Sequence, residues 1–129
     1  MAEIKNETIK QQTETVNAAI SFILCAEETS HVCVNVTATL FDGCLTVSGQ
    51  DFGEVVEECW GTDEYEYWYT FDRENTEKMF TVLTADGGDP ISEMKKRFSG
   101  MEGCKNLREF CAQEKIKFQF SNQVQADGE

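Results

Sequence analysis

The sequence predicts an α+β domain: a mainly antiparallel sheet of about four to six strands with two or three helices packed on one face. Two observations indicate this class. Apolar and polar residues alternate through much of the first 71 residues, and helical periodicity begins directly after Asp72. A last alternating run follows the helical stretch. Strands therefore come first, helices second and one strand last, an order typical of helices gathered on one side of an antiparallel sheet.

The strongest local signal is a hairpin at Asp42-Gly43. VCVNVTATLF leads into this dipeptide and CLTVSG leads out of it. Two residues of this type between alternating strands predict a type I′ turn, because both central residues need a positive φ. The turn fixes a register that pairs Leu40 with Leu45 and Ala38 with Val47.

The run from Val16 to Glu27 precedes the hairpin and is ambiguous. A short apolar run fits both a strand and a helix by periodicity alone, and we favour the strand. The two faces of that strand are expected to hold Ile20, Phe22 and Leu24 on one side and Ser21, Ile23 and Cys25 on the other.

The stretch Asp63–Leu83 changes from strand to helix. DEYEYWYTF predicts a strand, with its three tyrosines and Phe71 on one face. Glu64, Glu66 and Trp68 occupy the other face. Asp72 has the chemistry of a helix N-cap. An amphipathic helix is then predicted from the spacing of Thr76, Met79, Phe80 and Leu83.

Two more helices and a strand complete the expected fold. Asp89-Pro90 predicts a helix start, since proline fits the first helical position. Further elements are expected at about 102–114 (helix) and 116–120 (strand), and residues 49–61 receive no assignment. The predicted division is a flexible arm at 1–14, a single α+β domain at 15–121 and a flexible tail at 122–129.

Charge is the most unusual property of the chain. The formal net charge is −13, and residues 51–77 carry ten acids against one base, whereas residues 91–120 carry seven bases against four acids. Such a field disfavours nucleic acid and anionic membranes as partners and favours a basic protein or a cation. Solubility alone is the alternative explanation.

The N-terminal residues lack the apolar core of a secretory signal, so a cytoplasmic protein with six cysteines as thiols is expected. There is no C-x-x-C motif, and His31 is the only histidine. We therefore expect neither a metal site nor a cofactor.

Two groups of residues could support catalysis. Glu64 and Glu66 share a strand face with Trp68, an arrangement that a glycosidase or a cation site could use. Cys33 lies two residues after His31 and is expected to point the same way on a strand, as a thiol and its base would. Both groups also fit ordinary surface positions.

The sequence favours a small, acidic, non-catalytic binding protein of the bacterial cytosol that engages a basic partner through its 51–77 acidic and aromatic surface. Immunity-type and inhibitor-like proteins share this composition. One alternative is a small hydrolase or cation-dependent enzyme that uses Glu64/Glu66 or Cys33/His31. Another is a domain that acts within an oligomer. The predicted partner-binding residues are Asp63, Glu64, Glu66, Trp68, Trp60, Glu57 and Glu58.

Overall fold

The computed structural model describes residues 19–28, 32–53 and 64–125. The chain order is β1 (Ile20–Glu28), β2 (Val32–Phe41), β3 (Cys44–Gly53), β4 (Glu64–Phe71), α3 (Arg73–Leu83), α4 (Pro90–Phe98), α5 (Gly103–Glu114) and β5 (Gln119–Gln125). None of the helices in these described ranges is long and apolar enough to cross a membrane.

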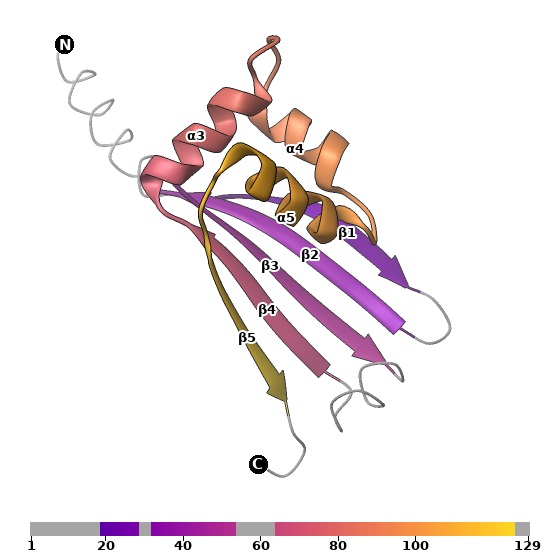
Figure 1. Ribbon diagram of the computed structural model, residues 1–129. Helices are drawn as coiled ribbons and strands as arrows, with labels where there is room; N and C mark the ends of the chain where they lie inside the picture. Colours follow the sequence, from indigo (N-terminus) through magenta and orange to yellow (C-terminus); the bar gives the residue numbers. More distant parts are fainter. Residues whose placement is uncertain (1–18, 29–31, 54–63, 126–129) are drawn as a thin grey trace, which may run out of the picture.

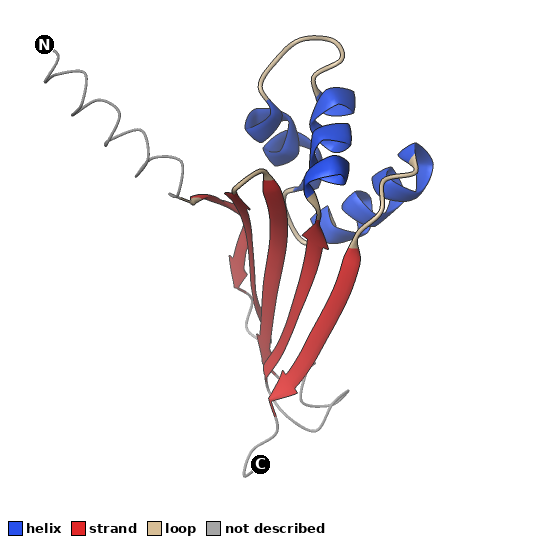
Figure 2. Ribbon diagram, turned by 90° about the vertical axis from the view of Figure 1, so that its left-hand side faces the viewer, coloured by secondary structure: helices blue, strands red, loops and turns tan. Residues whose placement is uncertain are grey.

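The five strands form one antiparallel sheet in the order β1-β2-β3-β4-β5. Between β4 and β5 the chain forms all three of the described helices, which lie together on one face of the sheet (Figures 1 and 2). The predicted α+β class is thus confirmed. Figure 1 also shows that the strands extend beyond the helices at the end where β1 and β3 finish.

The β2–β3 hairpin has the predicted geometry. Asp42 and Gly43 both have positive φ, at 54° and 79°. Leu40 pairs with Leu45 and Ala38 with Val47, as the two-residue turn requires. The hairpin therefore fixes which side of β2 and β3 faces the helices.

The core lies between the sheet and the helices. Each helix contributes one side chain with no exposed surface, and these are Met79, Met94 and Leu107. Their counterparts on the inner strands include Ala38, Leu45, Val47 and Phe71. Both predicted N-caps are present: Asp72 Oδ1 accepts a hydrogen bond from Asn75 N at 2.8 Å, and Asp89 Oδ2 accepts one from Ser92 N at 2.9 Å.

The run before the hairpin is a strand, as favoured, but one detail of its faces was predicted wrongly. A bulge between Ile23 and Cys25 interrupts strict alternation, so Leu24 and Cys25 are both buried. The loop after α4 meets this bulge, where Gly100 N donates a hydrogen bond to Leu24 O at 3.0 Å.

The last strand lies later in the chain than predicted, at Gln119–Gln125 instead of 116–120. Ile116 is buried and follows the end of α5 directly. Lys117 N donates to Asn75 Oδ1 of α3 at 2.9 Å, so the segment before β5 is held by a helix and joins the sheet only afterwards. Pairing with β4 continues to Gln125, within the segment that was predicted to be a tail.

Candidate functional site

The face of the sheet opposite the helices, which we call the open face, is polar. On β2, β3 and β4, alternation and cross-strand register place the following residues on the open face. They are Asn35, Thr37, Thr39, Thr46, Ser48, Gln50, Glu64, Glu66, Trp68 and Thr70. None of the five described strands contains a lysine or an arginine, so all charge that they contribute is negative.

The strand charges gather at one end of the sheet. Five acids occupy three successive cross-strand rows, at the end where the strands extend beyond the helices. We call this group the acidic end, and it consists of Glu27, Glu28, Asp51, Glu64 and Glu66. Like charges at this spacing repel, so the acidic end carries a concentrated negative potential.

Gln50 holds two of these acids in a fixed arrangement on the open face. Its Nε2 donates hydrogen bonds to Glu66 Oε2 at 2.7 Å and to Glu64 Oε2 at 3.2 Å. Gln50 lies on β3 directly opposite Glu66, and Glu64 is the next outward residue on β4. A single amide therefore orients both carboxylates before any partner arrives.

Trp68 stands next to Glu66 on the same face and is half-buried. It borders a shallow hollow of about 280 Å³. The hollow is lined by Asn35, Thr37, Ser48, Gly49, Gln50, Glu66 and Trp68. Hydroxyl, amide and carboxylate groups thus surround one aromatic ring, a combination that can receive a cationic or hydrogen-bonding side chain.

The structure brings only part of the predicted site together. Glu64, Glu66 and Trp68 lie side by side, whereas Glu57, Glu58, Trp60 and Asp63 lie outside the described residues. The acids at the end of the 51–77 window are elsewhere: Asp72, Glu74 and Glu77 lie at the opposite end of β4, around the first turns of α3. Gln50 and Asn35 were not predicted, because only cross-strand register places them beside Glu66.

Asp51, the first acid of the 51–77 window, points to the face of the sheet that carries the helices. Burial raises the pKa of its carboxyl group, although a hydrogen bond from Tyr67 Oη at 3.5 Å acts in the opposite direction. Cys104 and Arg108 of α5 line the same small cavity of about 250 Å³. Burial also raises the pKa of the Tyr67 phenol and of the Cys104 thiol, so neither is activated as a nucleophile.

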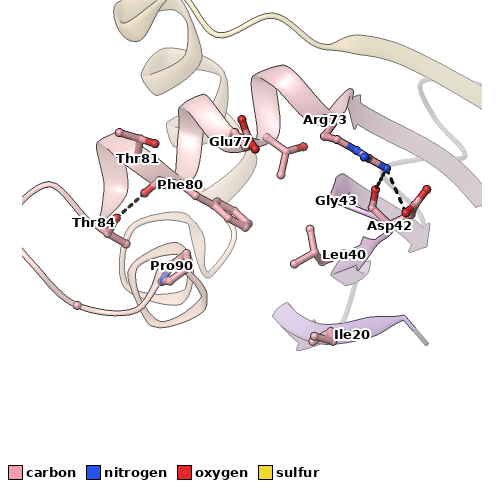
Figure 3. A pocket seen from close by; sticks show the side chains of 12 residues that line it. Ile20, Leu40, Asp42, Gly43, Arg73, Glu77, Phe80, Thr81, Thr84 and Pro90 are labelled. Atoms are coloured by element: carbon pink, nitrogen blue, oxygen red, sulfur yellow. Dashed lines mark hydrogen bonds and ion pairs between the residues drawn. The ribbon is translucent and has the colours of Figure 1, made fainter. Parts of the chain in front are cut away.

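A larger groove lies at the opposite end of the sheet, between α3, the start of α4, the start of β1 and the end of β2 (Figure 3). It measures about 850 Å³. Ile20, Leu40 and Phe80 contribute apolar surface, and Arg73 closes one end through an ion pair with Asp42 Oδ1 at 3.1 Å. The sequence contained no signal for this groove, because it forms between elements far apart in the chain.

The predicted thiol–imidazole pair has only one described member. Cys33 points to the open face, where Asn35 Nδ2 lies 3.6 Å from its Sγ, and His31 is outside the described residues. Cys25, Cys33, Cys44, Cys104 and Cys111 are free thiols. Across residues 19–28, 32–53 and 64–125, no three His, Cys, Asp or Glu side chains are close enough to hold a metal ion.

Comparison with known proteins gives no assignment: no family model, curated protein or solved structure matches this chain.

Proposed function

We propose that this chain is a small, acidic, non-catalytic binding protein that engages a basic protein partner through the open face of its sheet. The observation that carries the proposal is the arrangement around Trp68: a half-buried indole beside two carboxylates, in a sheet whose described strands contain no base. The partner is a protein with a surface rich in arginine or lysine, as in an inhibitor-like or immunity-type complex of the bacterial cytosol.

Each part of the open face has a defined role in such a complex. Glu64 and Glu66 accept charge-assisted hydrogen bonds, which are stronger than neutral ones. Trp68 offers a ring face to a cation and a large apolar area to the centre of an interface. Gln50 fixes both carboxylates in advance, so less side-chain entropy is lost on binding.

The geometry supports binding better than hydrolysis. A glycosidase places two carboxyl groups on either side of the scissile bond. Glu64 and Glu66 instead lie on one strand and share a single donor, Gln50 Nε2, so they face the same way on an open surface.

The test compares two double charge reversals. Glu64→Lys with Glu66→Lys removes the proposed contact, and Glu74→Lys with Glu77→Lys makes the same charge change at the opposite end of β4. Each protein is immobilised, and proteins retained from an extract of the native cell are identified. We expect the wild type and the Glu74/Glu77 variant to retain the same basic protein and the Glu64/Glu66 variant to lose it.

Association and dissociation rates measured with the purified partner distinguish the effect of the charges from that of the Trp68 anchor. Because charge sets the association rate, the Glu64/Glu66 variant should associate more slowly and with a weaker salt dependence. Trp68→Ala should mainly accelerate dissociation. Binding that survives both changes, in variants whose circular dichroism matches the wild type, would place the interface elsewhere.

A further inference from the structure

The two edges of the sheet differ in how they are protected. An edge strand presents unpaired backbone N–H and C=O groups, and natural proteins block such edges with bulges, charged side chains, prolines or covering loops. β1 has three of these features: the bulge at Leu24, the hydrogen bond from Gly100 N to Leu24 O, and the charges of Glu27 and Glu28.

The β5 strand itself has no such protective feature. Its sequence, QFSNQVQ, contains no charged residue and no proline. It pairs with β4 without a register shift from Gln119 to Gln125. Among the described residues nothing pairs with its outer side. The ring of Phe120 lies on the helical face, with its centroid 5.1 Å from that of Tyr69, and is 47% exposed.

We propose that β5 pairs antiparallel with β5 of a second copy, which joins two five-stranded sheets into one. A register centred on Asn122 places Phe120 opposite Val124 of the second copy and Ser121 opposite Gln123 of the second copy. Every pair in this register joins two even-numbered or two odd-numbered residues, so paired side chains lie on the same face of the sheet. Both helical layers therefore lie on one side of the joined sheet, and both open faces lie on the other.

The arrangement of the helices permits this dimer. The helices cover the part of the sheet near the β2–β3 hairpin and reach its middle, where Cys104 of α5 lines a cavity with Tyr67 (Figure 1). A two-fold axis through Asn122 reverses the second copy along the strand direction, so most of each helical layer lies toward an opposite end of the shared sheet.

Charge repulsion between the two copies does not prevent this pairing. The acids of the two β4 strands are three strand spacings apart, about 14 Å. That separation exceeds the screening length of about 8 Å at physiological salt, so the repulsion between the two acidic ends is largely screened.

The experiment is sedimentation equilibrium of the full chain in 0.15 M salt, with pairs of charges introduced on the exposed side of β5. Ser121→Lys with Gln123→Lys places two like-charge pairs across the interface. Ser121→Glu with Gln123→Lys, at the same positions, places two opposite-charge pairs there. We expect a mass twice the chain's 14.6 kDa for the wild type and for the opposite-charge variant. The like-charge variant should dissociate at least tenfold more readily.

A further variant tests the edge. Ile23→Lys adds a charge to the open-face side of β1, where the side chain is 63% exposed, and should leave dimerisation unchanged. A wild type that stays monomeric into the millimolar range would overturn the proposal. Two β5 double variants of equal affinity would overturn it as well, since the contact would then lie elsewhere or have another register.

Discussion

Replacing Gly49 by alanine should destabilise the fold through one aromatic ring. A Cβ at Gly49 would overlap Cζ, Cε2 and Oη of Tyr67, whose ring lies across the backbone of β3. Carbon atoms approach to about 3.5 Å, so the ring would have to move by more than about 1 Å. Tyr65 and Tyr69 limit that movement, because their ring centroids lie 5.5 Å and 6.1 Å from that of Tyr67.

The magnitude follows from opposing terms. Overpacking of a filled core costs about 1–3 kcal/mol, and disturbing an aromatic pair costs about 0.5–1.5 kcal/mol. Alanine recovers about 0.5–1 kcal/mol that glycine loses in a strand. The net loss is therefore about 2 kcal/mol, which for a urea m-value of about 2 kcal/mol/M lowers the unfolding midpoint by about 1 M.

A double-mutant cycle in urea, followed by circular dichroism, identifies the cause. Tyr67→Leu removes the ring, so in that background Gly49→Ala should stabilise the fold by about 0.5–1 kcal/mol. The coupling between the two positions should then be about 2.5–3 kcal/mol. The reasoning fails if Gly49→Ala is neutral in the wild type. It also fails if the cost is the same with and without the ring.

Three further substitutions or reactions test other parts of the structure. Gly43→Val should lower stability by about 1–2 kcal/mol, because φ at this turn is 79° and a β-branched residue resists positive φ; an unchanged melting temperature would contradict the turn assignment. In a native thiol titration Cys25, Cys104 and Cys111 should react more slowly than Cys33 and Cys44, because burial raises the pKa of all three, that of Cys111 to about 12; disulfides in the intact mass would contradict the thiol assignment. Asp51→Asn should raise stability at pH 7. Burial raises the folded-state pKa of Asp51 above its unfolded value, so the ionised form is disfavoured by folding, and the advantage of asparagine should vanish below about pH 4; melting curves across pH that show no such trend would contradict it.

Local chemistry predicted much of this fold. Asp42-Gly43 set the hairpin and its register, and Asp72 and Asp89 marked two helix starts, because each signal depends on residues adjacent in sequence. The β1 bulge was missed, since no residue type next to it marks a bulge and its hydrogen-bond partner, Gly100, is distant in sequence. The start of β5 was misplaced for a similar reason, because a side chain of α3 holds Lys117.

The candidate site was predicted in part for the same physical reason. Alternation along β4 correctly placed Glu64, Glu66 and Trp68 on one face. Proximity in sequence was a poor guide to the rest of the acidic window, because β4 spans the sheet and separates Glu66 from Glu77. Gln50 joined the site through register between strands, which a single sequence specifies only where a turn fixes it.

The separation of charge between the two layers has a kinetic consequence. The described strands hold five acids and no base, while the described helices and loops hold nine bases and ten acids, including Lys95, Lys96 and Arg97 on α4. The described chain is therefore an electric dipole as well as a net anion. A positively charged body at a distance exerts a torque that turns the acidic end of the sheet toward it before contact. Fewer random rotations are then needed for a productive encounter, and this orienting effect disappears as salt shortens the range of the field.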